Sequence, residues 1–364
     1  MLIIITYYPW YNKDTIVLLG DYMRSEISRN NHYISKMYLK EWECESGKVW
    51  VYNLLVSNKN IPIWNKEAIK NVCTYDSMFV RFSNGIEIDD IEKMFSEKYE
   101  TPANEPLNRA KKGEKLSIED WNAIIDFLVC NLIRMPSTLL KILNIDKNEF
   151  SKIFEEECEE FGKKLSSMTK NKFQNNNNEN KDDLSYASLF PLNVTIEKNN
   201  LLKIETYTGK QFYLSMAMKL LDFVSSIFHS NKWGIITVDD EIDLPTSDNP
   251  IIFLEYLNGN NYRLNCSWNQ KNVFILFPIS SKKIIYTRVG EKVQPRYYAN
   301  KEQSNFMKKI IVENSYMKVI SKNVDNELIN YKKRSVSKKN YNEYHLMWEN
   351  FQKDYLTKEQ KYIR

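Results

Sequence analysis

Glycine is scarce in this chain, with only nine among its 364 residues. Glycine-rich loops let a backbone approach phosphate groups closely, and neither the GxGxxG nor the GxxxxGKS/T spacing occurs here. The sequence therefore argues against a dinucleotide-binding or P-loop site. The patterns HExxH, GxSxG and HxE with CxxC are absent too, which argues against the metalloproteases, α/β-hydrolases and zinc deaminases that carry them.

Cysteine and histidine are also few. The five cysteines are an odd number, and no two of them have CxxC spacing. Isolated thiols are typical of a reducing compartment, so we expect a cytoplasmic protein without a disulfide framework. With three histidines in the whole chain, a histidine-rich zinc site is not expected.

Long hydrophobic runs are missing. The apolar start of the chain is short, has no basic residues before it, and is followed by acidic residues without a cleavage signal. It fits neither a signal peptide nor a membrane span, so we expect no membrane partner. The codons for the residues LGDY before Met23 could contain a ribosome-binding site that has been translated as part of the chain. We therefore expect the native start at Met23 and interpret residues 1–22 as a loose or non-native extension.

Neither sign of charge dominates, because 51 basic residues stand against 47 acidic ones. This near balance does not predict nucleic-acid binding. The exception is the stretch YKKRSVSKK at 331–339, which has five basic residues and no acid. Two interpretations stay open: a solvated surface or loose tail, and an arm that contacts phosphate groups. Residues 326–364 as a whole are expected to form a charged, partly helical tail.

Apolar and aromatic residues, at 43% and 13%, are sufficient for a core that needs no metal or disulfide. Apolar residues at helical spacing predict helices over 31–42, 87–112, 117–134, 211–230, 301–322 and 341–356. Short β-branched and aromatic runs predict strands over 48–53, 74–82, 233–238, 251–256, 273–279 and 283–287. Prolines within 87–112 are expected to divide that helix in two.

This order of elements predicts an α+β fold. A helical middle section would pack on a mostly antiparallel sheet formed largely by the C-terminal half of the chain. The strands 273–279 and 283–287 are expected to form a hairpin. The asparagine-rich stretch 171–183 has no apolar period and predicts a flexible surface loop.

Three groups of polar residues lie close to apolar runs, and the first is Asn31 and His32, followed by Lys36. A histidine at a helix start could act as a general base or contact a phosphate group. It could equally bind a backbone carbonyl and fix the path of the chain. Both interpretations remain open.

The second group pairs Glu92 with Arg134, which ends an apolar helix. A charge in such a place is costly unless it has a partner, and Glu92 on the preceding helix could supply one. A buried structural ion pair is one interpretation. The other is an arginine that recognises a phosphate or carboxylate of a substrate.

The third group is Ser247, Asp248 and Asn249, between two predicted strands. Polar residues at strand ends often carry function, so Asp248 could be a general base or a ligand of a divalent metal. The same residues also make a stable turn, because Asp and Asn bind their own backbone and the proline that follows fixes φ. No cofactor is specifically indicated.

Taken together, these segments resemble the DUF4238 family. The resemblance rests on segments in a fixed order: NHYISKMYLKEW, GKVWVY, the helix around Ile91 and Glu92, the RMP helix end, TSDNP, FPIS, and the helix expected to hold Asn305 and Tyr316. It covers about 31–322, which suggests a domain over 23–325. Ser35 departs from the proline common in the family, and the asparagine-rich stretch resembles an insertion. The resemblance implies a widespread, mainly microbial family without an established activity.

Two functions from different classes follow. The first is a hydrolase of a phosphodiester or nucleotide, such as a nuclease-like toxin or defence effector. Its catalytic residues would be His32, Glu92, Asp248 and Asn249, and its substrate-binding residues Asn31, Lys36, Arg134 and Ser247. The second is a non-catalytic binding module for a protein or nucleic acid, in which the same residues form a structural network. The partner would be a nucleic acid or nucleotide in the first case.

Overall fold

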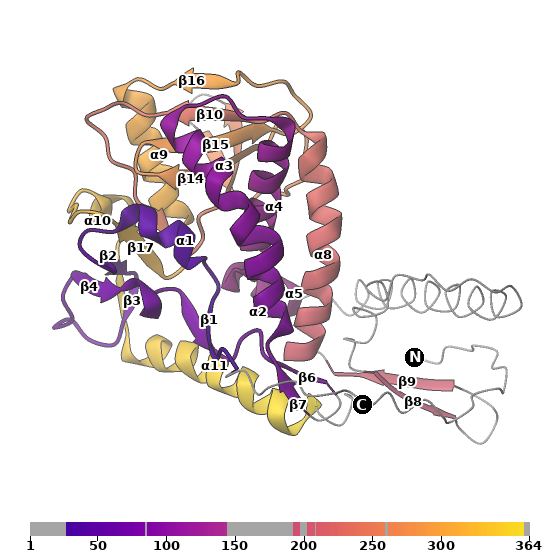
Figure 1. Cartoon of the computed structure of the whole chain (residues 1–364). Coiled ribbons are helices and arrows are strands. Elements are labelled where there is room, and N and C mark those ends of the chain that lie inside the picture. The colour runs from indigo at the N-terminus through magenta and orange to yellow at the C-terminus, as the bar shows by residue number, and fades with distance from the viewer. Residues whose placement is uncertain are drawn as a thin grey trace, which may run out of the picture.

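The structure is a computed structural model. It describes residues 27–83, 86–143, 192–196, 202–207, 209–258 and 261–359 (Figure 1). The expected native start and the asparagine-rich stretch 171–183 lie outside these ranges. Within them, the predicted α+β class is confirmed: a helical middle section stands beside mostly antiparallel sheets, the largest of which belongs to the C-terminal half.

The largest sheet has six strands in the order β13-β12-β14-β15-β10-β16. Their bounds are β10 Gly234–Thr237, β12 Ile252–Asn258, β13 Asn261–Leu264, β14 Phe274–Ser280, β15 Lys283–Arg288 and β16 Arg296–Tyr298. All neighbours are antiparallel except β10 and β16. The four strands predicted from this part of the sequence are confirmed to within two residues, as is the β14–β15 hairpin.

A second sheet joins distant parts of the chain in the order β11-β17-β2-β4. Its strands are β2 Lys48–Asn53, β4 Trp64–Ala68, β11 Thr246–Ser247 and β17 Lys318–Ser321. The predicted helix over 301–322 is therefore wrong beyond Asn314, where α9 (Lys301–Asn314) ends. The physical reason is tertiary, because β17 pairs along the whole of its length with β2.

Short strand pairs complete the sheets of the described residues. They are β1 Asn30–His32 with β5 Thr74–Asp76, β6 Arg81–Ser83 with β7 Ile86–Ile88, β8 Leu192–Ile196 with β9 Leu202–Thr206, and β3 Leu55–Val56 with β18 Ser335–Val336. The predicted helix over 31–42 therefore begins late, at α1 (Lys36–Leu39), and continues as a 3-10 turn over Lys40–Trp42.

The helical middle section begins with α2 (Asp90–Met94), a π-helical stretch (Phe95–Glu100) and α3 (Thr101–Lys112). The predicted division at the prolines is wrong. Pro102 lies in the first turn of α3, where a missing N–H is tolerated, and Pro106 lies inside the helix. The irregularity falls upstream of both, in the π-helical stretch.

Two long helices form the centre of the molecule, and they are α4 (Ile118–Arg134) and α8 (Lys210–Ser230). The predicted start of α4 is confirmed by a capping box in which Ser117 and Asp120 each bind the backbone N–H of the other. The short helix α5 (Pro136–Leu143) follows α4 at once. In Figure 1, α4 and α8 stand side by side, in agreement with their many contacts.

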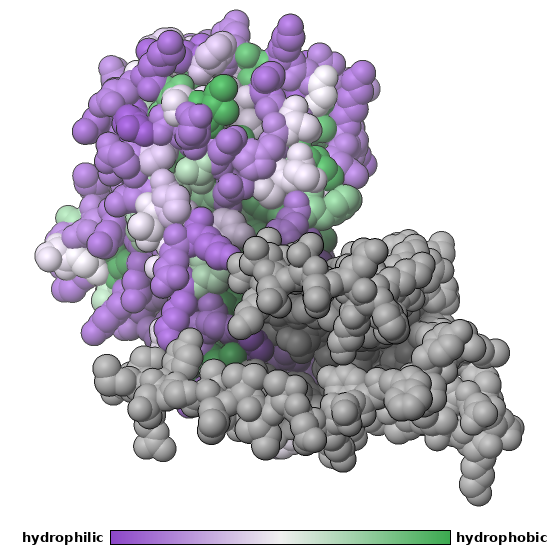
Figure 2. Space-filling model, turned by 45° about the vertical axis from the view of Figure 1, so that its right-hand side comes forward, coloured by the Kyte–Doolittle hydropathy of each residue, from purple (hydrophilic) through white to green (hydrophobic). Residues whose placement is uncertain are grey.

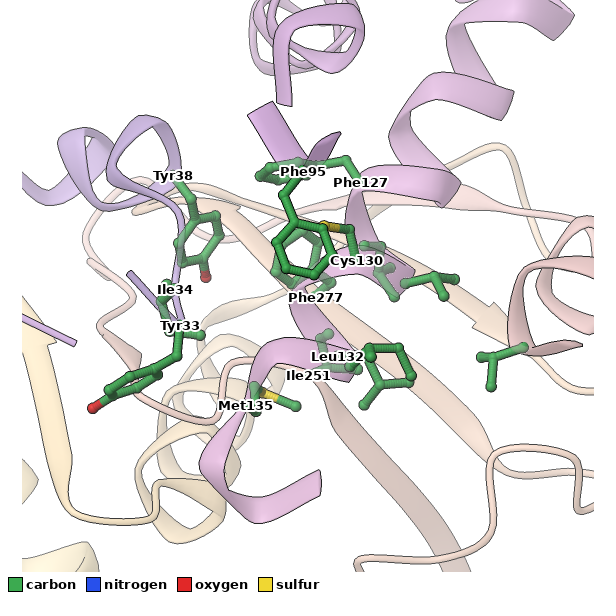
Figure 3. Packing of buried hydrophobic residues seen from close by; sticks show 14 of the residues in the cluster. Tyr33, Ile34, Tyr38, Phe95, Phe127, Cys130, Leu132, Met135, Ile251 and Phe277 are labelled. Atoms are coloured by element: carbon green, nitrogen blue, oxygen red, sulfur yellow. The ribbon is translucent and has the colours of Figure 1, made fainter. Parts of the chain in front are cut away.

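The six-stranded sheet buries both faces. Alternate side chains such as Phe253, Ile275 and Phe277 pack against the helical middle section in one cluster. Figure 3 shows this packing, with Phe277 lying close to Phe127 of α4. The intervening residues, such as Leu254 and Leu276, face α9 on the opposite side. This period of two explains why the strand signals were so readable in the sequence.

The C-terminal segment contains α10 (Leu328–Tyr331), β18 and α11 (Lys338–Thr357), and α11 lies against α8 and β3 (Figure 1). Cations of the basic run 331–339 are bound to backbone carbonyls. Lys332 Nζ donates to the carbonyl oxygens of Glu313 at 3.0 Å and Ser315 at 2.6 Å, and Arg334 Nη1 donates to that of Ile61 at 2.8 Å. These side chains fasten the segment to the body of the protein.

Candidate functional site

Arg134, the last residue of α4, is almost completely buried, with 1% of its side chain exposed. Its Nη1 lies 2.6 Å from Glu100 Oε1, and its Nη2 donates to the backbone carbonyl of His32. The predicted ion pair with Glu92 is confirmed, at 3.7 Å between Nη2 and Oε2. Sequence reasoning missed Glu100, which makes the shorter contact. We call Arg134, Glu92, Glu100 and His32 the junction cluster.

Two aromatic rings complete the surroundings of this guanidinium. Its Cζ lies 4.8 Å from the ring centre of Phe95 and 5.4 Å from that of Phe79, within the range of cation–π attraction. Burial raises the pKa of Glu92, and the charge of Arg134 opposes that shift only in part. The cluster is thus an internal ion pair between one cation and two carboxylates, enclosed by apolar groups.

The side chains of His32 and Asn31 are also used inside the protein. His32 is buried, and its Nε2 lies 3.2 Å from the carbonyl oxygen of Ile69. Burial lowers the pKa of His32 to about 4, so the ring is neutral at pH 7. Asn31 donates to the carbonyl of Ser28 and accepts the N–H of Phe79, both at 2.9 Å. Both residues hold the strand β1 against neighbouring segments.

Asp248 closes the turn between α9 and β17. One carboxylate oxygen accepts the N–H of Tyr316 at 2.8 Å, and the other accepts that of Met317 at 2.7 Å. Burial raises the pKa of Asp248, and these hydrogen bonds oppose the shift. Both oxygens already have donors, which leaves little capacity for a divalent metal. In the ranges that the structure describes, no group of three or more His, Cys, Asp or Glu residues could hold a metal ion.

Asn249 forms a reciprocal pair with Asn314 at the end of α9. Each side-chain amide donates to the backbone carbonyl of the other residue, at 2.8 and 2.7 Å. The Oδ1 of Asn249 accepts the hydroxyl of Ser137 at 3.0 Å, and its backbone N–H donates to Ser247 Oγ at 3.1 Å. These bonds join the turn after β11 to the start of α5.

The structure therefore gathers the predicted residues into two sets. His32, Glu92 and Arg134 belong to the junction cluster, while Ser247, Asp248 and Asn249 belong to the turn after β11. Arg134 ends α4 and Ser137 lies in α5, so the two sets contact the same helix junction. Lys36 is exposed and stands outside both sets of hydrogen bonds. The catalytic and substrate-binding roles assigned to these residues stay predictions.

A cavity of about 830 Å³ lies elsewhere, between the six-stranded sheet and α9. We call it the sheet–helix cavity. None of the eight predicted residues lines it. Its floor is the α9-facing side of the sheet, one wall is α9, and another is formed by the loop around Val293 together with β16. The cavity was not predicted from the sequence, because the residues of its floor alternate along the strands in the same way as buried core residues do.

One side of the cavity depends on Gly234 in β10, which pairs with Tyr286 in β15. A Cβ at Gly234 would lie 2.8 Å from Cε1 of Tyr286 and 2.2 Å from the carbonyl oxygen of Gln294. The missing side chain lets the Tyr286 ring lie across β10, where its hydroxyl donates to Gln294 at 2.9 Å. This contact holds the loop that forms the cavity wall.

The lining is more basic than acidic. Among the lining residues that the structure describes, three cations, Arg288, Lys292 and Lys309, accompany one carboxylate, Glu302. Arg288 lies over the ring of Phe274 at 5.3 Å, and its buried Nε has no hydrogen-bond partner. Unlike Arg134, it has no carboxylate within ion-pair distance in the described ranges.

The order of elements and the cavity together define an α+β protein with a hollow between its main sheet and one helix. The profile of the family described as "Protein of unknown function (DUF4238)" matches residues 30–325. Because this match covers well over half of the chain, the chain belongs to the DUF4238 family. The strand β18 and the helix α11 lie beyond the matched residues.

No curated protein and no solved structure matches the chain significantly. Within the described ranges, no single helix has the length and apolar character to cross a membrane. The consecutive helices α4 and α5, bent by 62°, reach that threshold only when they are taken together.

Proposed function

We propose that this chain is a binding module that holds a small anionic ligand in the sheet–helix cavity. In this proposal the junction cluster and the turn after β11 are a structural network, as in the second of the two functions considered from the sequence. The observation that carries the proposal is Arg288. It lines a partly apolar hollow and has no carboxylate within ion-pair distance among the described residues.

The energetics of Arg288 favour an anion. A guanidinium loses hydration when it is partly buried, and the protein normally compensates with a carboxylate. The ring of Phe274 returns only about 0.5–2 kcal/mol through cation–π attraction. A ligand carboxylate or phosphate would add charge-assisted hydrogen bonds in two parallel N–H···O contacts, for which a guanidinium is suited.

The size of the cavity also supports the proposal. At about 830 Å³, it falls within the range of about 300–1,000 Å³ that is usual for small-molecule sites. The apolar floor would exclude water from one side of a ligand, while Lys292 extends the positive potential toward solvent. Lys309 lies on the same lining, with Glu313 at 3.7 Å from its ammonium.

The hydrolase has less support. His32, the proposed base, is buried, neutral at pH 7 and engaged with the carbonyl of Ile69. Both oxygens of Asp248 accept backbone N–H groups. In the described lining of the sheet–helix cavity there is no histidine, and Glu302 is the single carboxylate.

Calorimetric titration of the full chain with benzoate, ribose 5-phosphate and adenosine 5′-monophosphate tests the proposal. We expect at least one of these anions to bind, with an affinity that falls as ionic strength rises. The variant Arg288→Gln should weaken binding about tenfold or more, because it removes charge-assisted hydrogen bonds worth about 1.5–3 kcal/mol. The matched control is Arg263→Gln on β13, at the edge of the same sheet, whose exposed guanidinium pairs with Glu255.

Two results would overturn the proposal. One is the absence of binding by all three anions at concentrations up to about 10 mM. At that concentration, even a binding free energy of only a few kcal/mol is measurable. The other is binding that Arg288→Gln and Arg263→Gln affect equally, which would place the anion outside the cavity.

A further inference from the structure

The sheet–helix cavity is unusually aromatic. Aromatic residues make up 13% of the chain, but six of the 19 lining residues are aromatic. They are Tyr256, Tyr262, Phe274, Tyr286, Tyr297 and Phe306. A hollow that held a plain inorganic anion or a flexible acyl chain would not need this enrichment. Flat rings offer broad, rigid faces, and their most favourable partner is another flat ring.

From these observations, and resting on the proposed function, we infer that the ligand is a mononucleotide. Its base would lie against the aromatic side of the cavity at Tyr256, and its phosphate would bind Arg288.

Tyr256 is the ring best placed to receive a base. It lies at the open side of the cavity and is 50% exposed. Its ring is held from within, because it stacks on Phe306 at 6.0 Å and meets Phe274 edge-on at 5.8 Å. Because the Tyr256 ring is already immobilised and one part of it is accessible, a base can stack on it with little further loss of conformational entropy.

Polar groups for reading a base are also present. The hydroxyls of Tyr256 and Tyr297 make no hydrogen bond to any described residue, although both side chains line the cavity. By contrast, the hydroxyls of Tyr262 and Tyr286 are used by Glu313 and Gln294, at 2.6 and 2.9 Å. A base carries donors and acceptors at its edge, so it could use the first pair without breaking the second.

The position of the cation relative to the platform matches a nucleotide. Phe274 contacts both, with its ring edge-on to Tyr256 and beneath the guanidinium of Arg288. One phenyl ring therefore separates the aromatic platform from the anion-binding group. In a nucleoside monophosphate, one sugar ring separates the base from the phosphate. Lys292 and Lys309 lie on the same lining and would face the remaining negative charge.

This site differs in kind from the nucleotide sites that the scarcity of glycine excludes. Dinucleotide and P-loop sites bind phosphates with backbone N–H groups at a glycine-rich turn. Here the phosphate would be bound by a side chain on an antiparallel strand, and β15 needs no glycine for that contact.

The test compares each of AMP, GMP, CMP and UMP with its own nucleoside and with ribose 5-phosphate, by calorimetry on the full chain. We expect one or more mononucleotides to bind more tightly than both the matching nucleoside and ribose 5-phosphate. Arg288→Gln should weaken the mononucleotide and ribose 5-phosphate about 10-fold to 100-fold and leave the nucleoside unchanged.

Tyr256→Leu should do the opposite. It should weaken the mononucleotide and its nucleoside about 5-fold to 100-fold, the value of one base stacked on an aromatic ring, and leave ribose 5-phosphate unchanged. Tyr298→Leu is the matched control, because Tyr298 is 73% exposed on β16 and does not line the cavity. Thermal unfolding of each variant checks that the fold is intact.

The outcomes separate this inference from the proposed function. If ribose 5-phosphate binds as tightly as every mononucleotide and still needs Arg288, the cavity takes anions but not nucleotides, and only this inference fails. If no phosphate or carboxylate binds, both fail. If a single-stranded oligonucleotide binds and no mononucleotide does, the ligand is a nucleic acid, and this inference is again overturned.

Discussion

The junction cluster and the sheet–helix cavity surround an arginine in opposite ways, and Arg134 is buried whereas Arg288 is half-buried. Around Arg134, two carboxylates, a backbone carbonyl and two aromatic rings surround the guanidinium, and none of these residues lines the cavity. Around Arg288, there is one aromatic ring and a hollow of about 830 Å³. The same side chain is paired in one region and unpaired in the other.

The contrast between Arg134 and Arg288 indicates which of the two charged side chains is available to a ligand. A buried charge whose counter-charges are all internal contributes to the fold, because its attraction to an opposite charge is already used inside the protein. A charge without an internal partner raises the energy of the empty protein and gains from a ligand that supplies the partner. Figure 2 shows many hydrophilic residues over the coloured part of the face turned to the viewer, so a hydrophilic residue at the surface does not by itself mark a site.

The largest expected effect breaks the junction cluster. Arg134→Met should lower the free energy of unfolding by about 3–5 kcal/mol, because Glu92 and Glu100 would be left near apolar groups without a cation. Urea unfolding followed by circular dichroism measures this. Arg263→Gln, which removes an exposed ion pair, should lower the free energy of unfolding far less. Equal losses in the two variants would contradict the structural role of Arg134.

The second largest effect is expected at Asp248. Asp248→Ala leaves the N–H groups of Tyr316 and Met317 without their acceptor and should lower the free energy of unfolding by about 2–3 kcal/mol. Asp240→Ala, at an exposed position in a nearby loop, is the control and should change it by about 0.5 kcal/mol at most. If ligand binding in the cavity were lost while Asp248→Ala kept its stability, Asp248 would belong to the site after all.

The third effect is a pH dependence carried by His32, whose pKa falls from 6.5 to about 4 in the folded protein. Between these values the unfolded chain binds a proton at this ring and the folded protein does not, so stability is lost as pH falls. His32→Gln should remove about 2 kcal/mol of that loss between pH 6.5 and pH 4. Parallel urea titrations of both proteins measure it, and identical slopes would show that His32 is solvated.

Helices and strands were predictable from the sequence where a local pattern alone decides their structure. The helix predicted over 117–134, the hairpin of 273–279 with 283–287, and the helix predicted over 211–230 all come from local sequence, and each prediction is confirmed. The failures are tertiary. The segment after Asn314 has a helical apolar pattern, but pairing with β2 makes it a strand, and that partner lies far away in the sequence.

The candidate site was harder to predict than the fold. The need of Arg134 for a partner was readable, since a charge in an apolar helix requires compensation, and the pairing with Glu92 is confirmed. The cavity left no such signal. Residues such as Tyr256 and Phe274 follow the same alternation as buried strand residues. Whether α9 covers them or leaves a hollow depends on where the helix lies on the sheet, which no local pattern reports.

The effect of removing Arg288 on stability is expected to be smaller than any of these. Arg288→Gln should change the free energy of unfolding by about 0.5 kcal/mol or less, because the loss of cation–π attraction to Phe274 is offset by relief from burying an unpaired cation. Urea unfolding without ligand measures this beside Arg134→Met. A loss as large as that of Arg134→Met would mean that Arg288 already has an internal partner, because breaking a buried ion pair costs about 3–5 kcal/mol. The cavity would then be another part of the structural network, and its cation would have nothing left to offer a ligand.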